Sequence, residues 1–271
     1  MKVLVYHKIH DKTQFEKQIK FLKRSYNIID PTCLEDHLCH GKSLPENSLM
    51  ITFDDGDSTL YKNAFPVLKR ENIPAIIFVI TNLIGTNEPF WWDELEYLLG
   101  EEEGNNKVWE VKTWPNKKRV QYLQELRSKS NKEQYKYPQL SIQELKEMQH
   151  ANILIANHTH THPMLDKCEE DELEEELFNS TEKLKERNFN YQYFAYPNGN
   201  YSERAEKKLV QHGIKYSFLF DHKINTGKLN PLRISRLKVN DNTPIWKLKF
   251  ILSGWHSRVL PVTRTLGKLR R

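Results

Sequence analysis

Two groups of ionisable side chains in this sequence have the types and spacing of a hydrolytic metal site. The carboxylate pair Asp54 and Asp55 ends an apolar segment and precedes Gly56. His158 and His162 lie four residues apart, again directly after an apolar segment. Adjacent carboxylates repel unless a cation binds one of them and leaves the other ionised as a base. Two imidazoles with one carboxylate leave an open metal position, where bound water becomes a nucleophile near neutral pH.

Each group alone also fits a purely structural role. An Asp-Asp-Gly sequence is common in turns, and three histidines within residues 158–162 also fit a surface run. The two groups together favour the metal site, because each follows a segment that reads as a buried strand.

The segments before these residues predict an α/β sheet or barrel. Helical spacing of Phe15, Ile19 and Leu22, and the ranges 60–70 and 169–187, predict helices between the strands. This alternation places a site at the strand ends. Apolar, β-branched runs predict strands at residues 3–6, 49–53, 74–79, 153–156 and 193–195.

Two further segments have less specific patterns. The acidic run at 169–176 predicts the solvated face of a helix rather than a cation site, because Leu173, Leu177 and Leu184 form an apolar stripe. The stretch 100–137 has weak periodicity and predicts an insertion or a lid.

Thr52-Phe53-Asp54-Asp55-Gly56, followed about a hundred residues later by a His-Thr-x-x-His motif, resembles the polysaccharide deacetylases with a NodB-like domain, carbohydrate esterase family 4. The resemblance extends from Tyr6 to Arg236. It implies a distorted (β/α) barrel, with a catalytic domain at 1–245. It also implies a hydrolase of carbon–nitrogen bonds other than peptide bonds, which removes N-acetyl groups from amino sugars of a polysaccharide or a lipid-linked glycan.

The resemblance also implies roles for single residues. Asp54 is similar to the family's general base, Asp55, His158 and His162 to its metal ligands, and Thr159 to a residue that buttresses the loop. The mixed imidazole and carboxylate ligands make zinc the expected ion, with cobalt, nickel or manganese as alternatives.

The sequence departs from the family pattern at two places. In the groove-wall motif at 194–199, Ala195 takes the place of an arginine, so the arginine clamp on the base is expected to be missing. Asn198 replaces an aromatic residue, although its backbone N–H is expected to stabilise an oxyanion; a simple turn is the alternative. The family's late histidine has no counterpart, and His7 is expected to be the general acid unless it is merely a strand-end polar residue.

A tryptophan pair at 91–92 resembles a segment in one branch of the same family. Trp92 and Leu95 have helical spacing, which predicts packing, so Trp91 or Asp93 is expected to contact substrate.

The net charge of +5 is concentrated at one end of the 271-residue chain. Residues 246–271 contain seven Lys or Arg and no acid, and predict a basic C-terminal appendage that contacts the inner membrane surface. The alternative is that its apolar residues cap the barrel. Three scattered cysteines and a start without a signal-peptide pattern predict a cytoplasmic protein.

Two other classes of function remain open at this point. A non-catalytic carbohydrate-binding descendant of the fold would have lost the base or the ligands, whereas all four residues are present. A nucleic-acid binder would need a basic patch with interleaved aromatics, which only residues 246–271 supply, so no nucleic acid is expected as a partner.

Overall fold

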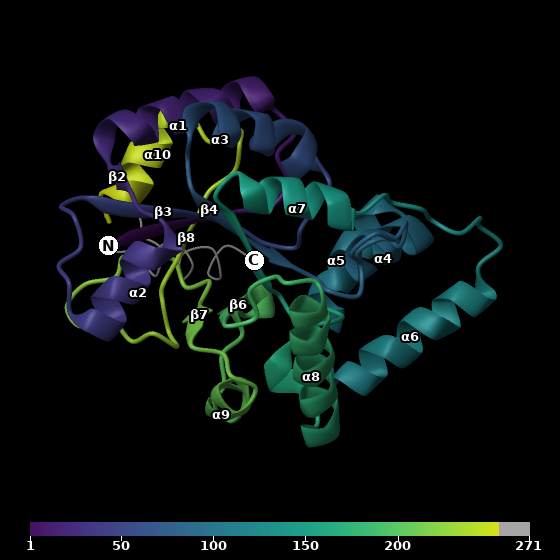
Figure 1. The fold of residues 1–271 in the computed structure, drawn as a ribbon. Helices are drawn as coiled ribbons and strands as arrows, with labels where there is room; N and C mark the ends of the chain where they lie inside the picture. Colours follow the sequence, from purple (N-terminus) through teal and green to yellow (C-terminus); the bar gives the residue numbers. More distant parts are fainter. Residues whose placement is uncertain (255–271) are drawn as a thin grey trace, which may run out of the picture.

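The strands form a parallel sheet that curls into a distorted barrel (Figure 1). The computed structural model describes residues 1–254. The strand order is β7-β6-β5-β4-β3-β1-β8, with β2 beside β3, and every pair is parallel. The predicted α/β class and distorted barrel are confirmed. The strands are β1 (Lys2–Tyr6), β2 (Asn27–Ile28), β3 (Ser48–Phe53), β4 (Ala75–Val79), β5 (Ile153–Asn157), β6 (Tyr193–Ala195), β7 (Tyr216–Phe218) and β8 (Leu237–Lys238).

A short segment at 234–239 connects the two ends of the sheet, because it pairs with β7 on one side and with β1 on the other. On one side, the Leu219 N–H donates to the Ile234 carbonyl at 2.8 Å. On the other side, β8 pairs with β1, and the Val239 N–H donates to the Val5 carbonyl at 3.1 Å. Arg236 lies between these two attachments and is fully buried.

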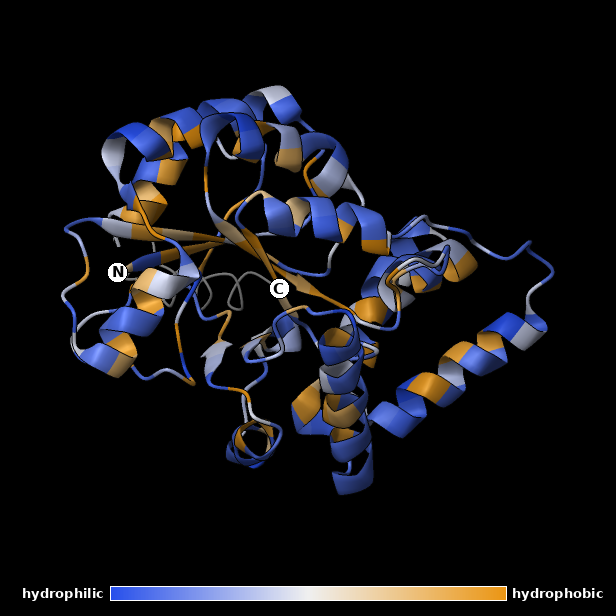
Figure 2. Ribbon diagram, in the orientation of Figure 1, coloured by the Kyte–Doolittle hydropathy of each residue, from blue (hydrophilic) through white to orange (hydrophobic). Residues whose placement is uncertain are grey.

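Successive strand residues fill two different cores, as expected for parallel strands that are buried on both faces. Leu4, Ile51 and Ile77 belong to the core beneath the outer helices. Their neighbours Val3 and Met50, with other inward-facing residues, fill the inside of the barrel. Figure 2 shows the hydrophobic strands at the centre, enclosed by helices with hydrophilic outer faces.

The helices begin at recognisable caps. Asp11 accepts from the Gln14 N–H at the start of α1, and Ser141 with Glu144 forms a capping box on α7. A π-helical turn, η1 (Leu60–Ala64), leads into α3. The α-helices around the barrel are α1 (Lys12–Ser25), α2 (Pro31–His40), α3 (Phe65–Glu71), α7 (Ile142–His150), α8 (Glu170–Glu186) and α9 (Glu203–Gln211); η2 (Leu165–Lys167) and η3 (Pro197–Gly199) are single 3-10 turns.

An inserted helical unit lies between β4 and β5. It comprises α4 (Trp91–Leu99), α5 (Glu101–Val111) and α6 (Asn116–Lys129), which share a small hydrophobic core. Gly104 lets α5 lie against α4, because a Cβ there would be 2.4 Å from the Glu96 Cα. The predicted insertion at 100–137 is therefore mainly two helices, and α4 joins them.

The final helix of the described chain, α10 (Ile245–Leu252), begins at the predicted domain boundary. Leu248, Ile251 and Leu252 are buried in the main core, whereas Trp246 and Phe250 are exposed. The rest of the predicted basic appendage, 255–271, lies outside the described residues. The predicted membrane contact falls largely on these residues and stays a prediction. Among residues 1–254, every helix is too short or too polar to cross a membrane.

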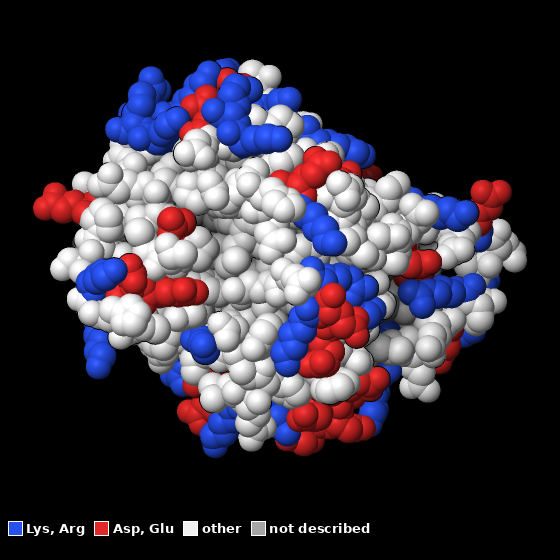
Figure 3. All heavy atoms as spheres, in the orientation of Figure 1, with Lys and Arg blue, Asp and Glu red and all other residues white. Residues whose placement is uncertain are grey.

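Charged side chains of both signs are distributed over the face in Figure 3. Lysines and arginines gather at the top, over α1, whereas acidic and basic groups mix around α8. On α8, Glu174 pairs with Lys208 of α9 at 2.9 Å. Most of the acidic run is therefore the solvated, ion-paired helix face that its pattern predicts, and Glu176 is the exception described below.

Candidate active site

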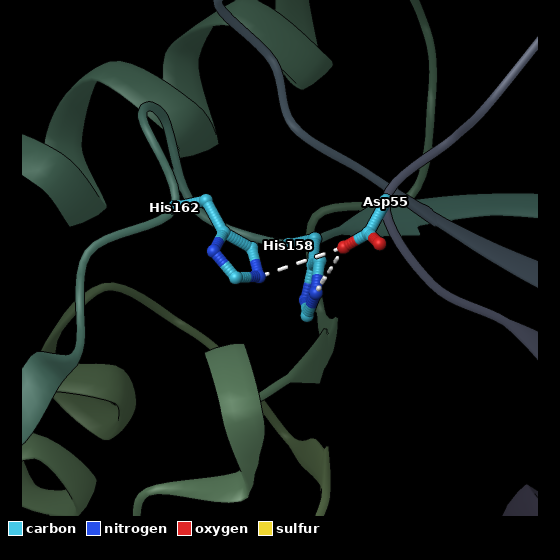
Figure 4. Close-up of side chains that lie close together, drawn as sticks. All are labelled: Asp55, His158 and His162. Carbon is cyan, nitrogen blue, oxygen red and sulfur yellow. Dashed lines mark ion pairs between the residues drawn. The ribbon is translucent and has the colours of Figure 1, made fainter. Parts of the chain in front are cut away.

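Asp55, His158 and His162 converge at the carboxyl end of the barrel (Figure 4). Asp55 follows β3, and both histidines follow β5. The Asp55 Oδ1 lies 3.3 Å from the His158 Nε2 and 3.5 Å from the His162 Nε2. All three side chains are buried. Residues about a hundred positions apart in the sequence thus present three potential ligand atoms to one point.

The chemistry of these three side chains fits a divalent metal ion. Ligand atoms about 2.1 Å from a tetrahedral zinc ion lie about 3.4 Å from one another, which the two measured separations match. The His158 Nδ1 lies 2.8 Å from the Ala195 carbonyl, so it carries the proton and leaves Nε2 free to bind a metal. Burial lowers the pKa of His162 and favours its neutral form.

Both ligand-bearing loops use left-handed backbone conformations. Asp55 and Gly56 have φ values of 70° and 73°, and a Cβ on Gly56 would lie 2.9 Å from the Val79 Cγ1. Thr159 and His162 have φ values of 70° and 57°. Such conformations are rare for residues other than glycine, so the surrounding contacts must hold the loops in place.

Glu176 of α8 supplies such contacts to the histidine loop. Its Oε2 accepts the N–H groups of His160 and Thr161, each at 2.9 Å, and its Oε1 accepts the Thr161 hydroxyl. Thr159 adds an internal brace, because its Oγ1 accepts the His162 N–H at 3.0 Å. The prediction that Glu176 lies on a solvated helix face is wrong, because its side chain is buried. Its position beside Leu173 and Leu177 on the apolar stripe was the available signal.

We predict that Glu176→Gln weakens metal binding by about 10- to 100-fold, the usual effect of changing a residue that holds metal ligands in place. The neutral glutamine oxygen would accept the N–H groups of His160 and Thr161 more weakly than the carboxylate does, so the loop between His158 and His162 would be held less firmly. Chelator competition measures the dissociation constant.

Glu174→Gln is the matched control, because this residue lies on the same helix and pairs only with the surface groups Lys208 and His212 among the described residues. Equal metal affinities of the two variants would show that Glu176 does not position the ligands.

Arg236 holds the second carboxylate of the pair. Its guanidinium bonds both oxygens of Asp54, at 2.6 and 2.7 Å, and also donates to the Leu219 carbonyl at 2.8 Å. The expectation that the arginine clamp is missing is therefore wrong. The chain has Ala195 at the family position, but Arg236 reaches the same carboxylate from the segment that closes the barrel. The sequence showed an arginine there, without any local sign that the ring would close beside Asp54.

His7 and Asn198 line the same pocket as Asp54, Asp55 and the two histidines. This pocket has a volume of about 280 Å³. His7 follows β1, and burial lowers its pKa. Asn198 has φ 56° within the turn η3. The next residue, Gly199, has φ 73°, and a Cβ there would lie 2.5 Å from the Phe220 Cβ. The strand ends thus place both predicted residues beside the potential metal ligands.

The roles predicted for Trp91 and Trp92 are reversed in the structure. Trp91 is buried, and its Nε1 donates to the His162 carbonyl at 3.2 Å. Trp92 lines the pocket, with its ring 4.7 Å from that of His162. Asp93 forms an ion pair with Lys8 at 2.6 Å. The predicted stripe was displaced by one residue, because Trp91 and Leu95, four residues apart, share the buried face.

The insertion forms one wall of the pocket. Asn105, Val108 and Trp109 of α5 and Lys112, directly after it, line the pocket together with Phe220 and Lys238. Trp109 is 63% exposed. The stretch whose role the sequence left open therefore borders the site.

A carboxylate clamped beside three potential metal ligands, at the strand ends of a parallel barrel, is the arrangement of a barrel hydrolase. Residues 41–217 match the family model described as polysaccharide deacetylase, and the chain belongs to this family. The predicted carbohydrate N-deacetylase class, a hydrolase of carbon–nitrogen bonds, is thereby confirmed.

Named relatives and solved structures agree with this family. A poly-beta-1,6-N-acetyl-D-glucosamine N-deacetylase of Staphylococcus aureus (strain MRSA252) is 30% identical over 244 residues, covering 85% of this chain and 67% of the relative. The Streptococcus pyogenes deacetylase PplD, solved with acetate, has a TM-score of 0.68 and 19% identity over 93% of this chain and 97% of its own. IcaB from Ammonifex degensii has a TM-score of 0.65 and 21% identity over 92% and 94%.

Proposed function

We propose that this polysaccharide deacetylase removes N-acetyl groups from a poly-N-acetylglucosamine chain and depends on a divalent metal, with zinc as the first choice. The observation that carries the proposal is the convergence of Asp55, His158 and His162 beside the clamped Asp54. The names of the relatives supply the substrate class. A lipid-linked glycan of the same sugar remains within this class.

Asp55, His158 and His162 would hold the ion, which when bound supplies a polarised water and an electrophile for the amide oxygen. Asp54 takes the proton of the attacking water, because it is the one carboxylate of the pair outside the ligand set. Arg236 fixes the plane of that carboxylate, and each oxygen keeps a lone pair for the water.

His7 and Asn198 complete the proposed mechanism. The Asn198 backbone N–H stabilises the charge that develops on the amide oxygen. His7 then donates a proton to the departing amine. Burial lowers its pKa, which makes the protonated form a stronger acid.

The test is acetate release from a panel of N-acetylated substrates with the zinc-loaded protein. We expect release from β-1,6-linked N-acetylglucosamine oligomers, and at least about tenfold lower kcat/KM for β-1,4-linked oligomers, because the linkage changes how neighbouring sugars fit along the edge of the pocket. Preference for the β-1,4 series would contradict the substrate assignment. Carbohydrate binding without acetate release from any substrate would instead favour a non-catalytic descendant of the fold.

A further inference from the structure

Two lysines that have no ion-pair partner among residues 1–254 border the active-site pocket. Among the described residues, Lys112 Nζ has Asn198 Oδ1 as its hydrogen-bond partner, at 3.4 Å, and Lys238 Nζ lies 5.5 Å from the Phe220 ring centroid. Asn198 and Phe220 are linked by the close approach of Gly199 to Phe220. Lys112, Asn198, Phe220 and Lys238 therefore form one continuous rim, called the lysine rim below.

The charges around the pocket leave this rim positive. Its lining contains the carboxylates of Asp54, Asp55 and Glu96. Arg236 balances Asp54, and a bound divalent ion would more than balance Asp55. The single negative charge of Glu96 then remains against the two positive charges of Lys112 and Lys238. Burial lowers the pKa of Lys112, because its ammonium group loses water at this point of the pocket, and a substrate ammonium group placed beside it would lose water as well.

The size of the pocket brings neighbouring sugars to the rim. Its volume, about 280 Å³, lies below the ~300–1,000 Å³ typical of pockets that enclose a drug-sized ligand. A pocket of this volume has room for about one amino sugar, so the adjoining units of a polymer would lie along its edge. Exposed Trp109, with Lys112 Nζ 4.7 Å from its ring centroid, offers a stacking surface there.

The reaction itself produces a cation, because an acetamide becomes a primary amine that is protonated near neutral pH. We propose that the lysine rim selects against substrates in which a unit next to the reacting sugar already carries a free amine. The enzyme then removes acetyl groups at spaced positions along a chain. This inference rests on the proposed function. It adds that Lys112 and Lys238 determine which sugars along the chain lose their acetyl groups.

The experiment compares two β-1,6-linked N-acetylglucosamine tetramers, one fully acetylated and one with a single free amine at an interior unit. We expect the wild-type protein to prefer the fully acetylated tetramer by about tenfold in kcat/KM. Lys112→Met and Lys238→Met should each reduce this ratio by about threefold, and Lys112→Glu should reduce it further. High salt should also reduce it in the wild type, because Lys238 is exposed and salt screens its charge.

Lys249→Met is the matched control, since Lys249 is an exposed lysine 5.4 Å from the Phe21 ring centroid, on α10. Its ratio should equal that of the wild type. A wild-type ratio near one, or ratios unchanged in the Lys112 and Lys238 variants, would overturn the inference and leave the proposed function intact. Absence of acetate release from both tetramers would contradict the proposed function, and the inference would fall with it.

Discussion

Asp54→Asn should reduce acetate release by about 10³-fold or more while the protein still binds one metal ion. An amide cannot accept the proton of the attacking water, and the general base contributes about 10²–10⁴-fold to such reactions. Asp55, His158 and His162 are unchanged in this variant, so the ligand set stays complete. Metal content by elemental analysis and acetate release, measured on the same sample, separate the two effects.

The same variant should also be less stable. Arg236 is fully buried against Asp54, and the loss of one partner of a buried ion pair costs about 3–5 kcal/mol. Activity has to be compared at a temperature where circular dichroism shows both proteins folded. Turnover of the folded Asp54→Asn protein within about tenfold of wild type would refute the role of Asp54 as base.

His158→Ala should abolish stable metal binding and, with it, activity. The variant removes a ligand whose Nδ1 is fixed by the Ala195 carbonyl, so no other nitrogen replaces its Nε2. The dissociation constant should rise by more than the ~100-fold that outer-shell changes cause. Chelator competition gives this value directly.

His160→Ala is the control for that experiment, because His160 lies in the same loop with its Nδ1 2.9 Å from the Thr81 Oγ1, away from the ligand set. This variant should bind metal with a dissociation constant within about tenfold of the wild-type value, because it removes none of the three potential ligands. If His158→Ala bound metal as tightly as His160→Ala, the ligand assignment would be wrong.

The sequence was sufficient to predict the barrel and the meeting of its strand ends. Apolar runs that end in Asp54 and in His158 define buried parallel strands, and parallel strands present their carboxyl ends at one edge. The five predicted strands all occur in the structure. Local pattern and topology therefore predicted that the carboxylate pair and the two histidines meet, and the family resemblance implied that Asp55, His158 and His162 are the potential metal ligands.

The partners of these residues depended on packing that the sequence does not display. Arg236 reaches Asp54 only because an irregular segment closes the barrel beside β1. Glu176 turns inward because its helix lies against the histidine loop. Trp91 and Trp92 exchanged roles because a shift of one residue rotates a helix by about 100°. Long-range contacts of this kind have no local signature.

Removal and restoration of the metal test the central claim most directly. After complete chelation, verified by elemental analysis, acetate release from a β-1,6-linked N-acetylglucosamine oligomer should fall to background. Stepwise addition of zinc should restore it in proportion to occupancy, with saturation at one ion per chain. Undiminished acetate release by the verified metal-free protein would contradict the account.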